Sequence, residues 1–357
     1  MSRGLAMACC LLGLCVSLIG APAPAWANLP PGNAVTDGRA LLRYALPLDS
    51  LEMRKVQKEV EDISEGLRAK RWRAMRRQVQ KAAKELNLRD QQIYAAAPPE
   101  TLAEVKTMVE ELRQNLAQLA SAIESQDKEQ TWIERRKTLN LISALEEKMV
   151  GGFPFEIPEE YADLPWLKGR ATVELETTQG SVTIVVDGYN APLTAGNFVD
   201  LVQRGFYDGL PFTRADESYV LQAGDPVGPA DGFIDAETNE NRVIPLEIRV
   251  DGDDEPIYGE MLENLGIFNA LPALPFSAYG TVGMARPNED VNQASSQFFF
   301  FLFEPEMTPA GLNLIDGRYA AFGYTVAGKE VLRELIQTDK IIKARVVEGA
   351  ENLVQSS

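Results

Sequence analysis

The chain has 357 residues, with 52 acidic residues, 35 Lys and Arg residues, three cysteines and no histidine. This length is sufficient for two domains that each bury a hydrophobic core. The absence of histidine excludes Ser-His-Asp triads and the usual Cys/His zinc sites, and the net charge of −17 disfavours binding to nucleic acids, whose phosphates carry the same sign.

Residues 1–27 are expected to be a signal peptide for export. Arg3 supplies a positive start, residues 5–19 form an apolar run, and Ala25-Trp26-Ala27 has the small residues of a cleavage site. A membrane anchor is the weaker alternative, because the apolar run is short for a spanning helix. All three cysteines would leave with the signal peptide, so the chain exported to a lumen or a periplasm would hold no disulfide.

Residues 28–150 are predicted to form a helical bundle. Four segments within residues 50–149 carry apolar residues at alternating steps of three and four, the spacing of one helix face. Four such stripes can bury one another, which favours an antiparallel bundle over seams for the helices of another protein. A shorter helix at residues 37–45 is expected to cap the bundle. The clearest stripe comprises Leu102, Val105, Val109, Leu112, Leu116, Leu119 and Ile123.

Residues 151–167 are expected to be a linker, and residues 168–357 a β-barrel domain. Gly151-Gly152 ends the last helix, and beyond Lys168 the apolar period changes from helical to alternating. Many short strands with two helices indicate a closed antiparallel barrel capped at both ends. A hairpin is predicted around 178–180, helices at 194–204 and 329–336, and further strands at 211–214, 219–223, 280–285, 297–303, 319–325 and 341–347.

Charge separates the two predicted domains. Residues 28–150 hold 21 basic and 19 acidic residues, whereas residues 151–357 hold 13 and 33. The bundle is therefore the better candidate for contact with acidic or peripheral membrane-associated proteins, and a solvated charged face is the alternative and commoner explanation of its charges. An acidic stretch near residue 251 invites a calcium interpretation, but Pro256 and Leu262 stand where a calcium loop needs glycine and a carboxylate. No metal and no cofactor is expected.

Two separated segments place one arginine beside an apolar strand. Phe212-Thr213-Arg214 precedes Gln222-Ala223-Gly224-Asp225, and the strand Ser295-Ser296-Gln297-Phe298-Phe299-Phe300-Phe301-Leu302 follows. An apolar pocket accepts the ring of proline, which has no N–H group, and a guanidinium supplies donors to the neighbouring amide. This combination suits the binding of proline-containing peptides.

At these residues the chain resembles the cyclophilins, the peptidyl-prolyl cis-trans isomerases. Further matching blocks lie at 190–198, 205–209 and 316–323, so that the resemblance covers about residues 168–350. Ordered blocks are more specific than one short motif. Together with the helical N-terminal half, the chain looks like the multidomain cyclophilins of the thylakoid lumen. That resemblance implies a protein-folding role for exported proteins, including photosystem II assembly or maintenance and contact with its subunits.

The resemblance also implies roles for individual residues. Arg214 occupies the position of the catalytic arginine, and Phe299 that of the floor of the proline pocket, while Phe298 and Phe300 on the other strand face are expected in the core. An exposed Arg214 paired with Asp216 or Glu217 is the alternative. The remaining substrate-binding positions are Tyr219, Val220, Gln222, Ala285, Gln297, Leu314, Ile315 and Tyr319.

Three of these positions depart from the family pattern. Tyr219 stands for a phenylalanine, Leu314 for an indole that many members carry, and Tyr319 for a pocket histidine. Losing the histidine and the indole removes two substrate contacts. The sequence therefore leaves open a second function, in which the barrel binds proline segments as a chaperone or assembly scaffold with weak turnover. It also leaves open that the bundle covers the proline site.

Overall fold

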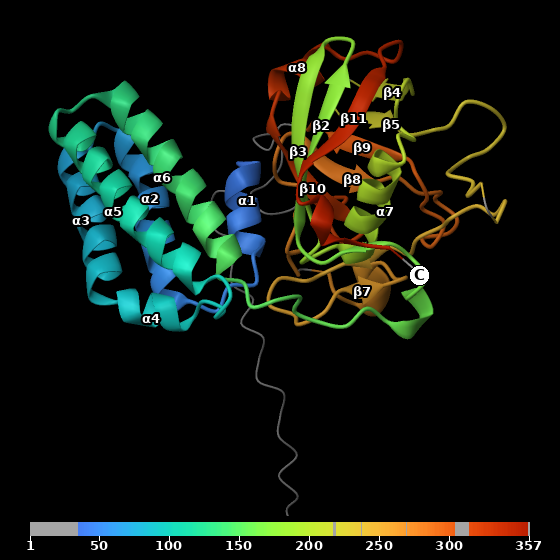
Figure 1. The fold of residues 1–357 in the computed structure, drawn as a ribbon. Helices are drawn as coiled ribbons and strands as arrows, with labels where there is room; N and C mark the ends of the chain where they lie inside the picture. The colour runs from blue at the N-terminus through green and yellow to red at the C-terminus, as the bar shows by residue number, and fades with distance from the viewer. Residues whose placement is uncertain (1–34, 217–218, 237, 269, 304–313, 356–357) are drawn as a thin grey trace, which may run out of the picture.

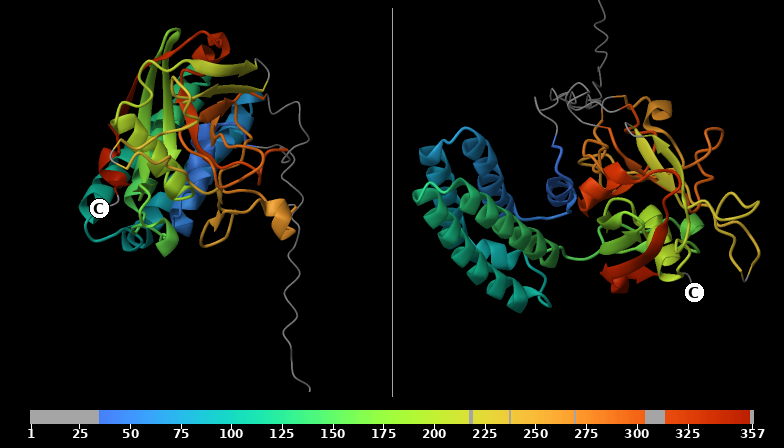
Figure 2. Two further views of the ribbon diagram at one scale, coloured as in Figure 1. Left: turned by 90° about the vertical axis from the view of Figure 1, so that its right-hand side faces the viewer. Right: turned by 90° about the horizontal axis from the view of Figure 1, so that it is seen from above.

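Two bodies, a helical bundle and a β-barrel, stand side by side in the computed structural model (Figure 1). The structure describes residues 35–355 except 217–218, 237, 269 and 304–313. The predicted signal peptide lies outside these residues. The two further views in Figure 2 show that the bundle meets the barrel along one side only. Among the described residues, no helix is long and apolar enough to cross a membrane.

The bundle is built from the four apolar stripes. α2 (Leu51–Arg68), α3 (Trp72–Leu88), α5 (Leu102–Glu124) and α6 (Lys128–Lys148) pack together, and the short α4 (Asp90–Ala95) joins α3 to α5. Residues of all four stripes fill one core, which confirms the predicted bundle. The side chain of Asp127 accepts a hydrogen bond from the backbone N–H of Gln130 at 2.9 Å and so caps α6 as the sequence indicates.

The sequence predicts that the first helix caps the bundle, but its apolar face packs on the barrel instead, and polar contacts such as the ion pair of Arg43 with Glu61 of α2 at 2.8 Å join it to the bundle. α1 (Gly38–Ala45) forms, but its Leu41 and Leu42 belong to the core of the barrel. Gly38 lies against Tyr324, so closely that a Cβ atom there would be 2.7 Å from the Tyr324 Cβ. The sequence of an eight-residue helix shows that the helix has an apolar face but not which surface that face packs on. In this structure the apolar face of α1 packs on the barrel.

The barrel is an eight-stranded antiparallel sheet that curls until its edge strands approach each other. Its strand order is β11-β2-β3-β10-β8-β9-β5-β4. The N–H of Phe212 donates to the carbonyl of Asp339, and the N–H of Ile341 to that of Leu210, across the two edges. The strands are β2 (Arg170–Thr177), β3 (Gly180–Asp187), β4 (Phe212–Asp216), β5 (Val220–Ala223), β8 (Thr281–Met284), β9 (Phe298–Phe301), β10 (Ala321–Ala327) and β11 (Ile341–Glu348).

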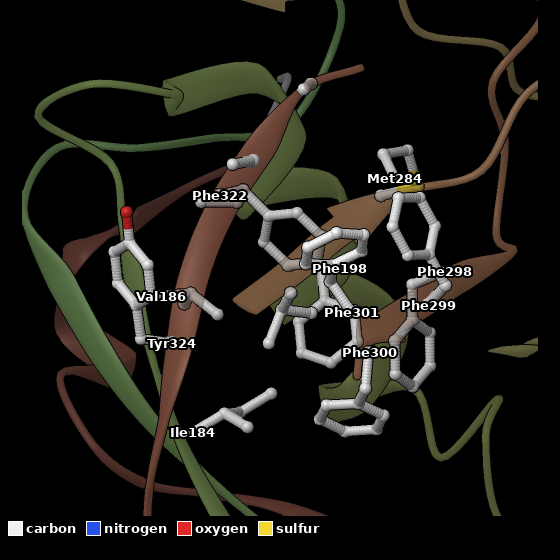
Figure 3. Close-up of a cluster of buried hydrophobic side chains, with 14 of the residues drawn as sticks. Ile184, Val186, Phe198, Met284, Phe298, Phe299, Phe300, Phe301, Phe322 and Tyr324 are labelled. Atoms are coloured by element: carbon white, nitrogen blue, oxygen red, sulfur yellow. The ribbon is translucent and has the colours of Figure 1, made fainter. Parts of the chain in front are cut away.

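Two helices accompany the barrel, as predicted. α7 (Pro192–Gln203) inserts Phe198 among the side chains of the sheet, and α8 (Lys329–Glu334) follows β10. The ring of Phe198 lies 5.0 Å from that of Phe298 and 5.3 Å from that of Phe322 (Figure 3). This aromatic cluster fixes β9 and β10 relative to α7.

Two pairs of short strands are absent from the sequence-based expectation. β1 (Trp166–Leu167), at the end of the predicted linker, pairs with β12 (Leu353–Val354), and β6 (Glu247–Ile248) pairs with β7 (Ile257–Tyr258). Strands of two residues are too short to show alternation. Glu247 of β6 is buried and accepts hydrogen bonds from the N–H groups of Leu193 and Thr194, so the acidic stretch supplies the N-terminal cap of α7.

Arg170 joins the two bodies and α1. Its buried guanidinium donates to Asp187 of β3 at 2.7 and 2.9 Å, to Glu147 of α6 at 2.8 Å, and to the carbonyl of Leu42 in α1. Asp187 is fully buried and also accepts from the backbone and side chain of Asn190. Removal of the Arg170 guanidinium would leave the Asp187 carboxylate buried without a cation, which costs folding free energy.

We expect Arg170→Ala to lower the free energy of unfolding by about 3–5 kcal/mol, because it leaves Asp187 buried without its cation. Chemical denaturation followed by circular dichroism measures the loss. Arg345→Ala is the matched control, since Arg345 pairs with Glu174 at 3.2 Å on neighbouring strands with both side chains substantially exposed; it should change stability by about 1 kcal/mol or less. Equal effects of both variants would contradict the role assigned to Arg170.

Glu146, beside Glu147 in α6, is a buried carboxyl without a hydrogen-bond partner among the described residues. Burial raises its pKa to about 8, while Arg54, 3.8 Å away, acts in the opposite direction. The unfolded chain loses this proton near the ordinary pKa of 4.5. The folded chain keeps it to higher pH, so the carboxyl lowers stability progressively as pH rises from about 4.5 to about 8.

We therefore expect Glu146→Gln to match the parent chain at pH 4 and to exceed its free energy of unfolding at pH 8 by on the order of 2–4 kcal/mol. Denaturation at a series of pH values measures the difference. Glu129→Gln, at an exposed position of the same helix, controls for the loss of one carboxylate. A gain for Glu146→Gln that is constant over the whole pH series would contradict this account.

Candidate active site

A pocket of about 360 Å³ opens on the face of the barrel formed by β4, β5 and β9. Its lining includes nine of the ten residues that the sequence places in the site, which come from segments as far apart as residues 214 and 319. These nine are Arg214, Tyr219, Val220, Gln222, Ala285, Gln297, Phe299, Ile315 and Tyr319. Leu314, the tenth, is 85 % exposed and is not among the residues that line the pocket.

The register of the sheet brings the central residues together. Arg214 of β4 lies opposite Gln222 of β5, Gln222 lies opposite Phe299 of β9, and Phe299 lies opposite Gly283 of β8. Residues directly opposite each other on antiparallel strands project from the same face of the sheet. The cation, the amide and the apolar ring therefore form one row across three strands.

Phe299 forms the apolar floor of the pocket. Its ring is stacked on that of Phe276 at 5.8 Å, and the ring of Tyr319 meets it at a right angle at 5.7 Å. Gly283 makes room for this floor, because a Cβ atom there would lie 2.6 Å from the Phe299 ring. Phe299 remains only 6 % exposed, so most of its surface packs against its neighbours and one edge is open to a ligand.

The neighbouring phenylalanines follow the alternation that the sequence predicts. Phe298 contacts Phe198 and Tyr207 on the other face of the sheet, with ring centroids 5.0 and 5.3 Å apart, and Phe300 is buried beside Phe298. Phe301 returns to the face of Phe299, where it contacts Phe276. Figure 3 shows the four side chains along the strand.

The guanidinium of Arg214 is exposed at the rim of this pocket. Within the described part of the chain it forms no hydrogen bond and no ion pair. Glu217, one of the two carboxylates considered as its partner, lies outside the described residues. Because its donors are not taken by the described residues, Arg214 can offer them to a ligand whose apolar part lies on Phe299.

Two glutamines form a side-chain hydrogen bond between β5 and the segment that leads into β9. Gln222 Nε2 donates to Gln297 Oε1 at 2.7 Å, and Gln297 Nε2 donates to Asp231 Oδ1 at 2.9 Å. Gln297 also lies 3.4 Å from Asp225 Oδ1. These bonds fix the orientation of both amides from the side of the loop that holds Asp225 and Asp231. The family resemblance also allows these glutamines to orient Arg214, but among the described residues neither of them bonds to Arg214.

Arg286 and Tyr319 form the opposite wall. The Arg286 guanidinium lies over the Tyr319 ring at 4.7 Å and donates to the carbonyls of Arg318 and Pro287, each at 2.9 Å. Tyr319 is thus held between a cation and the edge of Phe299. Arg286 also lines the pocket although its role was not predicted from the sequence, and the same holds for Asp231, Pro287, Asn288, Gln293 and Ser295. The only sequence signal for most of them was their position between Ala285 and Gln297.

No residue of the bundle lines this pocket among the residues that the structure describes. The bundle contacts the barrel through Arg170 and α1, which lie on β2, β3 and β10 rather than on β4 and β5. For the described residues, the arrangement contradicts the alternative in which the bundle covers the site.

Comparisons with known proteins match two parts of the chain to two different family models. Residues 172–351 match the model of the cyclophilin type peptidyl-prolyl cis-trans isomerases, and residues 37–150 match that of a PsbQ-like domain of CYP38-like peptidyl-prolyl cis-trans isomerases. The chain is 22 % identical to a solved cyclophilin type isomerase of Cryptosporidium parvum, crystallised with the dipeptide Ala-Pro. That match has a TM-score of 0.37 and covers 49 % of this chain and 98 % of the other.

Two relatives are similar over almost the whole chain. A putative thylakoid lumen peptidyl-prolyl cis-trans isomerase of Synechocystis sp. is 53 % identical over 92 % of this chain and 87 % of its own length. The chloroplastic peptidyl-prolyl cis-trans isomerase CYP38 of Arabidopsis thaliana is 41 % identical over 91 % of this chain and 77 % of its own length. The combination of both domains is therefore shared with these relatives.

We expect Phe299→Leu to weaken the binding of proline-containing peptides about fivefold, because the flat ring is lost. Its apolar volume is largely kept, so its free energy of unfolding should change by about 1.5 kcal/mol or less. Phe300→Leu is the matched control on the other face, and it should lower stability without weakening binding. Peptide titrations and thermal melts of both variants measure these effects; weaker binding only for Phe300→Leu would overturn the assignment of faces.

Proposed function

The chain belongs to the cyclophilin-type peptidyl-prolyl cis-trans isomerases, and we propose that Arg214 and the Phe299 pocket carry its catalysis on exported proteins. The observation that supports these roles is the row of Arg214, Gln222 and Phe299 across three adjacent strands. It presents a cation with available donors and an apolar floor on the same face, which are the two parts that a proline substrate needs.

Rotation about an X–Pro bond is slow because amide resonance imposes a barrier of about 18–20 kcal/mol. In the twisted transition state the proline nitrogen regains a lone pair that can accept a hydrogen bond. In the proposed mechanism, the proline ring lies on Phe299 and the Arg214 guanidinium donates to this nitrogen. The bond forms only when the amide is twisted, so it stabilises the transition state more than either ground state.

The glutamine pair has a positioning role in this proposal. Gln222 and Gln297 are held by their mutual hydrogen bond and by the bond of Gln297 to Asp231. Gln222 lies between Arg214 and Phe299 in the register of the sheet, and Gln297 lies two residues before Phe299 in the chain. Their amides are therefore available to the substrate backbone on either side of the proline. Tyr219, Val220, Ala285, Ile315 and Tyr319 enclose the ring and the neighbouring residues.

One observation favours weaker turnover as a second candidate function. Leu314 is 85 % exposed and contributes nothing to the pocket wall, and Tyr219 is 37 % exposed. With fewer contacts around the substrate, less binding energy is available to hold the twisted amide. In this second function the barrel binds proline-containing segments of other proteins as a chaperone or assembly scaffold.

The proposed clients are exported proteins of the thylakoid lumen. This proposal is supported by the relative described as a putative thylakoid lumen isomerase and by the chloroplastic relative. Photosystem II subunits are the proposed clients in particular, because the chain resembles lumenal cyclophilins with a helical N-terminal half. Affinity capture from native membranes with the chain of residues 28–357, with and without excess proline peptide, tests which proteins occupy the pocket.

We expect Arg214→Ala to reduce kcat/KM for isomerisation of a short X–Pro peptide about a hundredfold, the usual effect of removing one preorganised donor. Its thermal melt should be unchanged, because the side chain is exposed. Arg345→Ala, at a distant exposed arginine, is the control for loss of one positive charge. An Arg214→Ala protein as fast as the parent would refute the catalytic role, and a parent no faster than buffer that still binds the peptide would favour the scaffold function.

A further inference from the structure

The segment between Glu65 and Glu85 contains many basic residues and no acidic one. It holds eight Lys and Arg residues and no acidic residue, whereas the remainder of residues 28–357 holds 26 basic and 52 acidic residues. The charge of this segment is therefore opposite to that of the rest of the molecule. The eight residues are Arg68, Lys70, Arg71, Arg73, Arg76, Arg77, Lys81 and Lys84.

The helix gathers these charges on one exposed face. At 3.6 residues per turn, Arg73, Arg77, Lys81 and Lys84 lie within a single stripe of α3, and all four are exposed. Arg68, Lys70 and Arg71 extend the stripe along the exposed turn before α3. Over the 17 residues of α3 the face is about 25 Å long. We call these seven exposed residues the α3 basic face.

Most of this charge is not neutralised within the described chain. Lys81 forms an ion pair with Glu59 at 3.2 Å, and no other residue of the α3 basic face has an ion pair there. Elsewhere in the bundle acidic residues do accompany the cations, as in Lys55 with Glu85 and Lys58 with Asp62. Like charges one helical turn apart repel each other, and an external anionic partner would relieve that repulsion.

The position of α3 leaves the face accessible. α3 packs against α2 and α5 and forms the outer edge of the bundle, on the side away from the barrel (Figure 1). The barrel, with 33 acidic and 13 basic residues beyond position 150, would be repelled by an anionic surface. An extended anionic surface can therefore approach at this edge and not at the barrel.

We propose that the α3 basic face docks the protein on an anionic lipid surface as a peripheral protein. Binding to anionic lipid headgroups needs a cluster of several basic residues, and it does not need a deeply buried apolar anchor. A protein partner usually requires buried aromatic or apolar anchors. Among the exposed positions of α3, only Leu88 at its end is a large apolar residue. The length, the charge and the scarcity of anchors thus favour lipid over an acidic protein.

Co-sedimentation of the chain of residues 28–357 with vesicles tests this proposal. We expect binding to vesicles that contain phosphatidylglycerol, none to phosphatidylcholine alone, and loss of binding as salt is raised. Because each basic residue near an anionic surface strengthens partitioning about fivefold, the triple change Arg73→Glu, Arg77→Glu and Lys84→Glu should weaken binding about a hundredfold or more.

A matched variant separates the α3 basic face from net charge. Lys128→Glu, Arg136→Glu and Lys137→Glu reverse three exposed cations of α6 and change the total charge equally, and this variant should bind within about threefold of the parent. Replacement of the α3 residues by glutamine repeats the test with helix propensity kept, should the glutamate variant melt early.

Three results would overturn the proposal. These are absence of binding to the phosphatidylglycerol vesicles, an equal loss in the α3 and α6 variants, or binding of soluble polyglutamate by the parent chain that exceeds its binding to vesicles. The last result would assign the face to an acidic protein instead.

Discussion

The arrangement of this protein depends on one buried cation. Arg170 lies at the start of β2. Its guanidinium donates hydrogen bonds to Asp187 of β3, to Glu147 of α6 and to a backbone carbonyl of α1. A buried guanidinium requires several acceptors, and no single element offers enough of them. The bundle, α1 and the sheet are therefore brought to one point, and among the described residues none of the bundle lines the pocket.

That placement leaves the pocket to the barrel alone. The site depends on the register of the sheet. Arg214, Gln222 and Phe299 become neighbours because β4, β5 and β9 pair at these positions, and the one irregularity of the β4–β5 pairing falls between Phe212 and Arg214. A shift of one residue in β9 would put Phe298 or Phe300 in the pocket and Phe299 in the core. The aromatic contacts of Phe298 with Phe198 and Tyr207 oppose such a shift, so packing on one face of the sheet secures the site on the other.

Charge is distributed unevenly between the two ends of the molecule. The acidic residues are concentrated in the barrel, where Asp231 holds Gln297 and Glu247 caps α7. The uncompensated basic residues lie at the far edge of the bundle. A molecule with this separation presents one end to anionic surroundings and keeps the other, which holds the pocket, turned away from them. In the two proposals made above, the barrel therefore binds proline segments and the bundle contacts an anionic surface.

By itself, the sequence determined the elements whose signal is local or carried by family motifs. Periodicity predicted the four long helices, alternation predicted the strands of the barrel and the two faces of the phenylalanine strand, and the motif blocks predicted nine of the residues that meet in the pocket. Only the tertiary structure decided where α1 docks, that Leu314 stands outside the pocket, and that Arg286 and Asp231 hold Tyr319 and Gln297. These outcomes depend on contacts between residues distant in the chain, and no local pattern records which of several apolar or charged partners a side chain will meet.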